Sequence, residues 1–387
     1  MQPSGILEKE KATNPLKALA KLGQSVWLDY IRRDLIETGE LERLIEEDGL
    51  AGMTSNPSIF EKAMVESRYY SDRLKDLARR TDLDAAGRYE LLAIRDIQDA
   101  ADALRPVYES TGRRDGYVSL EVSPLLAHDT EATLKEARRL WKALNRENVM
   151  IKVPGTQAGI PAFEQLTSEA ININVTLLFA QEVYEKVAEA YIAGLGKLAA
   201  RGGDVSRIAS VASFFISRID TLVDSIAQDR LKTASEEAHR TMLDSILGKV
   251  AIANGKQTYQ RYLRIFRGAG WEQLARQGAR TQRVLWASTS TKNPKYRDVM
   301  YVEELIGAHT VNTMPPATMD AYRAHGRARA SLTEDVESAN QTMARVARAG
   351  ISMKEVTDKL TQDGVRLFAD SFSTLLKAVE ASSKASK

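Results

Sequence analysis

The chain has 387 residues, 43% hydrophobic and 27% charged, a composition typical of a globular protein with room for one large domain or two smaller ones. Its 54 basic and 52 acidic side chains give a net charge of +2 with no long block of one sign, which argues against nucleic acid as the main partner. The absence of cysteine excludes disulfides, thiolate metal sites and a cysteine nucleophile, as fits a cytoplasmic protein. The longest apolar run, 208–216, is too short to cross a membrane, and 1–13 lacks the apolar segment of an export signal.

Short apolar runs separated by longer amphipathic segments predict strands alternating with helices. The expected strands are 25–29, 49–54, 117–121, 149–153, 171–176, 207–213, 283–288 and 309–314. Such alternation predicts a parallel α/β sheet. Eight units in a chain of this length favour a single closed (β/α)8 barrel of the TIM type, with additional helices, over a doubly wound sheet.

Two connections, 58–115 and 217–282, are far longer than one crossover helix, so each is expected to hold two or more helices. We expect one domain over 1–387, with flexible tails at 1–13 and 381–387. Near the C-terminus, apolar residues at helical spacing predict a stripe that faces the core or, alternatively, covers the barrel mouth. The stripe comprises Val356, Leu360, Val365, Leu367, Phe368, Phe372, Leu375 and Leu376.

One lysine, Lys152, lies inside a predicted buried strand that ends at Pro154 and Gly155. Burying an ammonium group is costly, so this lysine is expected either to have a charged partner or to lose its proton. A neutral buried amine attacks carbonyl groups and forms Schiff bases. The plain alternative is that the stem of Lys152 packs in the strand while its ammonium group extends to water.

Polar residues stand at the ends of the predicted strands. In a barrel these C-terminal ends form one mouth, where catalytic groups gather. Each residue alone has a simple structural explanation, such as a turn or a helix cap, but together they would surround one carbonyl carbon with acid, base and hydroxyl-binding groups. The residues are Asp29, Thr54, Ser55, Asn56, Glu121, Lys152, Asn174, Thr176, Ser213 and Ser288.

Four segments, 25–33, 52–60, 151–156 and 174–179, resemble the transaldolase family in its longer bacterial form, and the resemblance extends from about Asn14 to Val379. It implies a class I aldolase barrel that moves a dihydroxyacetone unit between sugar phosphates of the pentose phosphate pathway. The donor would be sedoheptulose 7-phosphate or fructose 6-phosphate, and the acceptor glyceraldehyde 3-phosphate or erythrose 4-phosphate. No metal or organic cofactor is implied.

By position, the resemblance implies that Lys152 forms the Schiff base and that Asp29 handles the proton of the C4 hydroxyl. It also implies that Glu121 acts through a water held by Thr176. These roles agree with the chemistry, because carbon–carbon cleavage needs a base near the hydroxyl and an electron sink at C2, which a protonated imine provides. The residues implied to bind substrate hydroxyls are Asn56, Asn174 and Ser213.

The phosphate site departs from that of the shorter transaldolases. Arg218 matches one phosphate-binding arginine, but Ser290 stands where the second would be. Lys292 is able to supply the missing charge and Ser288 a hydrogen bond. Alternatively, Lys292 is an ordinary solvated loop lysine.

Two other functions compete with transaldolase. A fructose 6-phosphate aldolase cleaves the same bond but releases dihydroxyacetone to water; by resemblance, those enzymes tend to carry Gln where this chain has Glu121 and Tyr where it has Phe215. The second is a non-catalytic barrel that binds sugar phosphates. The expected partners are small sugar phosphates, for a monomer or a homodimer.

Two further motif matches carry little weight. The segment 194–199 fits a dinucleotide-binding fingerprint by letter, but it follows a helical pattern rather than a strand. The four histidines, His128, His239, His309 and His325, lack metal-ligand spacing, so we expect no metal site.

Overall fold

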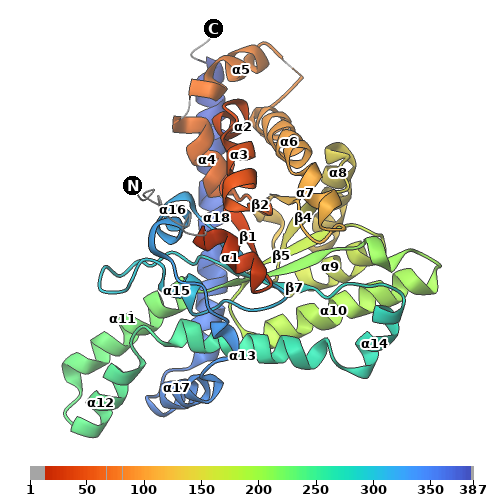
Figure 1. Ribbon diagram of the computed structural model, residues 1–387. Coiled ribbons are helices and arrows are strands. Elements are labelled where there is room, and N and C mark those ends of the chain that lie inside the picture. Colours follow the sequence, from red (N-terminus) through yellow and green to blue (C-terminus); the bar gives the residue numbers. More distant parts are fainter. Residues whose placement is uncertain (1–13, 67, 81, 385–387) are drawn as a thin grey trace, which may run out of the picture.

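The computed structural model describes residues 14–66, 68–80 and 82–384. Its parallel strands form a closed barrel in chain order, and β1 completes the ring by pairing with both β2 and β8 (Figure 1). The predicted (β/α)8 barrel with additional helices is therefore confirmed. The strands are β1 (Gln24–Asp29), β2 (Gly52–Thr54), β3 (Tyr117–Glu121), β4 (Val149–Pro154), β5 (Ile173–Leu178), β6 (Ser210–Phe215), β7 (Arg283–Ala287) and β8 (Thr310–Met314).

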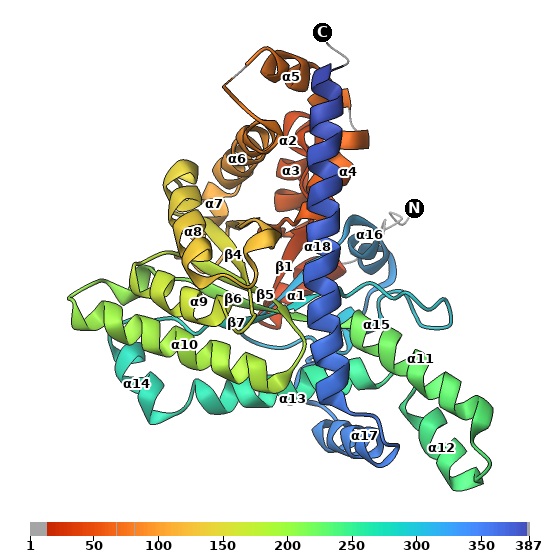
Figure 2. The ribbon, with the colours of Figure 1, turned by 180° about the vertical axis from the view of Figure 1, so that it is seen from behind.

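Helices surround this barrel and fill both long connections, as predicted for 58–115 and 217–282. Figures 1 and 2 show α11 and α12 projecting away from the barrel. The helices are α1 (Pro15–Lys21), α2 (Arg33–Glu37), α3 (Glu40–Arg43), α4 (Pro57–Glu66), α5 (Arg68–Ala78), α6 (Ala85–Ala103), α7 (Arg105–Ser110), α8 (Thr130–Leu144), α9 (Gly159–Ser168), α10 (Gln181–Ala200), α11 (Ser217–Thr233), α12 (Glu237–Ile246), α13 (Val250–Ile265), α14 (Ala269–Arg276), α15 (Met300–Glu303), α16 (Pro316–His325), α17 (Val336–Arg348) and α18 (Met353–Lys384).

Two predicted strands begin too early. The strand expected at 49–54 starts only at Gly52, because the preceding residues form a π-helical turn (Leu44–Asp48) that ends at Gly49 with φ +71°. The strand expected at 207–213 starts at Ser210, because Val205–Arg207 form a 3-10 turn. Local turns of this kind override the apolar pattern that suggested a longer strand.

Other boundaries shift by one or two residues. Ser288 and His309 were expected in strands but lie just outside β7 and β8. Both have positive φ angles, +56° and +58°, which do not fit a strand. The strand expected at 171–176 runs from Ile173 to Leu178, with a register shift against β6 between Val175 and Leu178. Asn174 therefore lies within β5 rather than at its end. Ser213 likewise lies within β6, which continues to Phe215.

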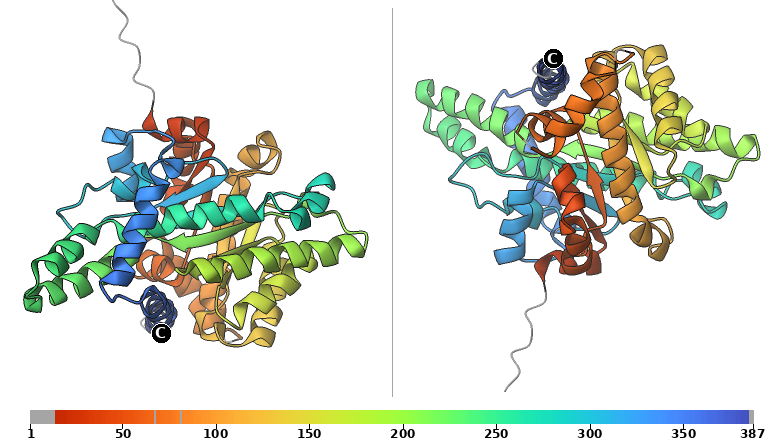
Figure 3. Two further views of the ribbon diagram at one scale, coloured as in Figure 1. Left: turned by 90° about the horizontal axis from the view of Figure 1, so that it is seen from below. Right: turned by 90° about the horizontal axis from the view of Figure 1, so that it is seen from above.

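The long helix α18 crosses the structure beside the barrel, where it packs against α4, α5, α6, α11 and β5. Figure 2 shows its full length, and the views of Figure 3 show it nearly end-on. Most of the predicted apolar stripe is buried, and Phe368 also lines the barrel mouth, so both expected roles occur together. Leu367 was wrongly assigned to the stripe: it is 48% exposed, because it precedes Phe368 by one residue and faces the other way.

The structure describes only part of the two expected tails, 1–13 and 381–387. Residues 1–13 and 385–387 lie outside the described residues. Helix α18 continues to Lys384, beyond the expected start of the C-terminal tail at 381. None of the described helices is long and apolar enough to cross a bilayer.

The apparent dinucleotide fingerprint lies inside helix α10, as its helical pattern indicated. Gly194 allows α10 to approach α9 closely, since a Cβ atom there would lie 2.7 Å from the backbone oxygen of Glu164. Gly196 faces open space. The glycines therefore serve helix packing and helix surface, without the strand-to-helix turn that phosphate binding requires.

Candidate active site

A pocket of about 470 Å³ opens at the C-terminal ends of the barrel strands. All of the predicted site residues except Glu121 and Asn174 line it, and those two are buried beside it. The predicted lining residues are Asp29, Asn56, Lys152, Thr176, Ser213, Phe215, Arg218, Ser288 and Lys292. The strand ends thus bring together residues that are far apart in the chain, from Asp29 to Lys292.

Lys152 is held on β4 between Glu121 of β3 and Asn174 of β5, its partners in the strand register. Its Nζ atom lies 3.5 Å from a carboxylate oxygen of Glu121 and donates a hydrogen bond to the backbone oxygen of Ser55 at 3.1 Å. The side chain is only 5% exposed. The lysine therefore has the charged partner that burial demands, and the alternative of an ammonium group extended to bulk water is wrong.

Glu121 is a buried carboxyl group that faces this lysine. Burial raises its pKa to about 7; the charge of Lys152 and a hydrogen bond from it oppose the rise, and the charge of Asp29 adds to it. Apart from the Lys152 contact at 3.5 Å, neither carboxyl oxygen of Glu121 has a hydrogen-bond partner among the described protein groups, and the hydroxyl of Thr176 has none. These oxygens are therefore available to a water molecule or to a substrate hydroxyl.

Asp29, at the end of β1, is the second carboxyl group of the pocket. It accepts a hydrogen bond from the Thr54 hydroxyl at 2.7 Å. Burial raises its pKa, while Lys152, Thr54 and Arg218 each oppose that rise. Two carboxyl groups and two cations thus compensate one another within a buried site, as an arrangement of charges away from water requires.

Asn174 lies one layer below the mouth and is fully buried. Its side-chain oxygen accepts a hydrogen bond from the Ser213 hydroxyl at 2.7 Å, and its nitrogen donates to the Ser119 hydroxyl at 3.1 Å. These bonds fix the direction of the Ser213 hydroxyl, which lines the pocket. Ser213 and Asn174 are consequently a connected pair rather than two independent groups.

Arg218 and Lys292 form a cationic side of the pocket. Arg218 lies in the first turn of α11, with its guanidinium over the ring of Phe215 at 5.2 Å. Burial lowers its pKa, and Asp29 opposes that effect. The amine of Lys292 donates to the hydroxyl of Ser290 at 3.0 Å, and Lys292 is an exposed residue at the edge of the same pocket.

Ser288 connects the loop after β7 to the start of α11. Its hydroxyl is hydrogen-bonded to that of Ser217 at 2.9 Å, and its backbone oxygen accepts from the Ser217 nitrogen at 3.0 Å. Ser217 begins α11, so these bonds tie the loop after β7 to the helix that carries Arg218.

The sequence analysis missed several residues that line the pocket. Phe368 of α18 lies 5.8 Å from Nζ of Lys152, measured to the ring centre, and covers it from above the barrel. Periodicity placed Phe368 on a helical stripe expected to face the core or to cover the barrel mouth, but did not single it out as a site residue. Tyr30 and Lys62 also line the pocket, and their only signal in the sequence is that Tyr30 follows Asp29 and Lys62 lies six residues after Asn56.

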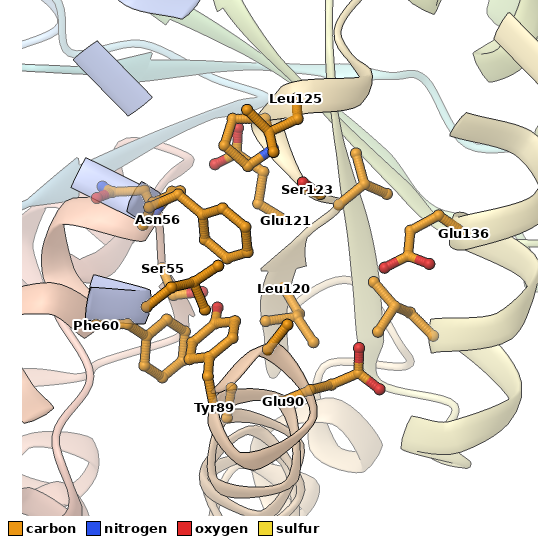
Figure 4. Close-up of a pocket in the computed structure, with 18 of the residues that line it drawn as sticks. Ser55, Asn56, Phe60, Tyr89, Glu90, Leu120, Glu121, Ser123, Leu125 and Glu136 are labelled. Carbon is orange, nitrogen blue, oxygen red and sulfur yellow. The ribbon is translucent and has the colours of Figure 1, made fainter. Parts of the chain in front are cut away.

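A second pocket, of about 360 Å³, lies on the other side of Asn56 and Glu121. Figure 4 shows Phe60, Tyr89 and Leu120 together on its wall, with Glu90 and Glu136 on the side away from Asn56. Burial, together with the charge of Glu121, raises the pKa of Tyr89. Glu121 therefore lies between two pockets while remaining buried, and this burial raises its pKa.

A lysine and two carboxyl groups at the mouth of a (β/α)8 barrel are typical of enzymes that work on carbonyl compounds. Residues 26–379 match the family model described as transaldolase/fructose-6-phosphate aldolase, and the chain belongs to that family. It is 46% identical over 372 residues to "Transaldolase 2" of Nostoc punctiforme, covering 95% of this chain and 97% of the relative. It is 47% identical over 366 residues to "Transaldolase" of Thiobacillus denitrificans, covering 95% and 99%, and 43% identical over 361 residues to that of Neisseria gonorrhoeae, covering 93% and 98%.

The raised pKa of Glu121 predicts a pH-dependent stability. Since its pKa of about 7 in the fold lies above the ordinary 4.5, the folded protein binds more protons than the unfolded chain between these values. The stabilisation is complete below pH 4.5 and is lost as the pH rises through 7. Urea unfolding of wild type and Glu121→Gln from pH 4 to 8 should show wild type losing up to about 1.4 kcal/mol per pH unit relative to the variant.

The exposed substitution Glu42→Gln provides the control for a charge change away from the barrel. The free energy of unfolding of this variant, plotted against pH, should run parallel to that of wild type from pH 4 to 8. Parallel curves for Glu121→Gln as well would contradict the raised pKa.

Proposed function

We propose that the protein is a transaldolase, which transfers a dihydroxyacetone unit between ketose and aldose phosphates through a Schiff base on Lys152. The observation that carries the proposal is the buried pair of Lys152 and Glu121, 3.5 Å apart, in the pocket at the barrel mouth. The reaction would convert sedoheptulose 7-phosphate and glyceraldehyde 3-phosphate into erythrose 4-phosphate and fructose 6-phosphate. Family membership supports this choice of substrates.

The first step is attack of the Lys152 amine on the ketose carbonyl at C2. The amine must be neutral to attack, and Glu121 is close enough to take its proton. The resulting carbinolamine loses its C2 hydroxyl as water. Glu121, with a pKa near neutrality, donates the proton for that loss, directly or through a water that Thr176 helps to hold.

The second step is cleavage of the C3–C4 bond. Asp29 takes the proton of the C4 hydroxyl, the C4 oxygen becomes the carbonyl of the departing aldose, and the bonding electrons move into the protonated imine. The dihydroxyacetone unit remains on Lys152 as an enamine. An acceptor aldose then enters, C3 attacks its aldehyde carbon, Asp29 returns the proton to the new hydroxyl, and water releases the product.

Arg218 and Lys292 would hold the phosphate at the far end of the sugar. Arg218 offers a planar fork that matches two phosphate oxygens, and it sits in the first turn of α11, where the helix dipole also favours an anion. Lys292, two residues after the position at which the shorter enzymes have an arginine, would supply the second charge. Ser290, to which its amine is bonded, keeps that charge directed at the pocket.

Phe215 and Glu121 favour transfer over simple aldol cleavage. Phe215 lines the pocket with a ring that has no hydroxyl, so it cannot return a proton to the enamine. The enamine should therefore persist until an aldehyde arrives. A fructose 6-phosphate aldolase, which belongs to the same family, is the second candidate. We further propose a single-domain, cytoplasmic enzyme, acting as a monomer or a homodimer.

The test is release of glyceraldehyde 3-phosphate from fructose 6-phosphate, measured with and without erythrose 4-phosphate. A transaldolase should sustain release only when the acceptor is present, because each turnover otherwise stops at the enamine. Comparable release without acceptor would identify an aldolase instead. No release under either condition would favour the non-catalytic alternative.

Lys292→Ala should raise the Michaelis constant for fructose 6-phosphate several-fold with little change in kcat, because phosphate binding is remote from the bond that breaks. Lys295→Ala is the matched control, since Lys295 lies in the same loop but does not line the pocket. Equal Michaelis constants for the two variants would remove Lys292 from the phosphate site.

A further inference from the structure

A pocket of about 360 Å³ lies at the opposite end of the barrel from the candidate active site. Residues that precede β3, β6, β7 and β8, together with Trp271 of α14, line it, so it belongs to the N-terminal ends of the strands. Nothing in the proposed reaction uses this end. Its charged lining is cationic and consists of Arg113, Arg114, Arg280, Arg283 and His309.

Only one of these cations is neutralised within the barrel. Arg283 is buried and pairs with Asp115 at 2.9 Å. Asp115 also accepts hydrogen bonds from the Ser25 hydroxyl at 2.8 Å and from the Trp27 indole at 3.2 Å. Its two oxygens are thus committed to Arg283 and to the barrel floor, so Asp115 does not balance the remaining arginines.

The other arginines lack a carboxylate partner among the described residues, and two of them donate to backbone carbonyls instead. Arg114 donates to the backbone oxygen of Gly23 at 3.2 Å, and Arg280 donates to that of Arg113. Over the described ranges, no carboxylate lies within 4.0 Å of the guanidinium of Arg113, Arg114 or Arg280. Three positive charges therefore face one concavity without neutralisation.

The nearest acidic groups are engaged elsewhere. Asp204, which faces Arg113, accepts hydrogen bonds from the backbone and hydroxyl of Ser206. Glu147 pairs with Arg105 at 3.4 Å and with Arg207 at 3.2 Å. Both carboxylates thus have their partners outside the pocket.

Mutual repulsion among the cations lowers the pKa of two lining groups, in addition to the larger effect of burial. Burial lowers the pKa of Arg114, with a further contribution from Arg283 that Asp115 opposes. Burial also lowers the pKa of His309, and Arg114 and Arg283 add to that effect. An anion in the pocket would relieve this repulsion.

We propose that this pocket binds a small phosphate-bearing anion at a site separate from the candidate active site. Guanidinium groups match phosphate oxygens in pairs, and those of Arg113 and Arg114, before β3, and of Arg280, before β7, line this pocket. The concave shape suits a phosphate with a small attached group better than an extended polyanion. This inference is independent of the proposed function, because it rests on the other end of the barrel.

The His309 ring reports directly on the pocket. Since the chain has only four histidines, its imidazole protons can be followed individually by NMR. In a pH titration, inorganic phosphate should raise the pKa of His309 relative to chloride at equal ionic strength, because a bound anion stabilises the charged ring. The effect should saturate with phosphate concentration. The signal of His325, whose ring contacts Asp298, should show no difference between phosphate and chloride.

Arg114→Gln should weaken phosphate binding on the order of tenfold, since it removes one charged hydrogen-bond donor. Arg113→Gln is a second variant that retains the bond from Arg114 to Gly23. Arg276→Gln, which removes an exposed arginine of α14 outside the pocket, should leave binding unchanged. A response of His309 that does not saturate, or that is identical in all three variants, would overturn the proposal.

Discussion

The structure of the site depends on one constraint: the ammonium group of Lys152 is buried inside a barrel. A charge in that position needs a partner, and the parallel register supplies one by placing Glu121 on the adjoining strand. The same burial raises the pKa of Glu121 to about 7. The pair that stabilises the charge is consequently also able to exchange a proton near neutral pH, which is what imine formation requires.

The rest of the pocket follows from the need to compensate and enclose that pair. Asp29 adds a second carboxyl group on β1, and Arg218 adds a second cation from α11. Phe368, carried by α18 from the far end of the chain, closes the space over the lysine. The long helix that looks peripheral in the ribbon views is thus part of the site's wall (Figure 2).

Much of this arrangement was predictable from sequence because strand ends in a barrel must meet. Lys152 stood out as a charge in an apolar run, and the residues of the mouth followed from the strand pattern. The residues below the mouth were harder to predict. Asn174 was expected at a strand end, but β5 continues to Leu178, and Asn174 is buried with a hydrogen bond from Ser213. Phe368 was placed on a stripe that faces the core or covers the mouth, but its contact with Lys152 was not predictable, because periodicity defines a face and only tertiary packing defines its neighbour.

The most direct test of the account is to trap the imine with borohydride in the presence of fructose 6-phosphate and to locate the modified lysine by peptide mass spectrometry. Three lysines line the pocket, namely Lys62, Lys152 and Lys292, so the result discriminates among them. The account predicts a reduced adduct on Lys152 alone, absent from Lys152→Ala. An adduct on another lysine, or its persistence in that variant, would contradict it.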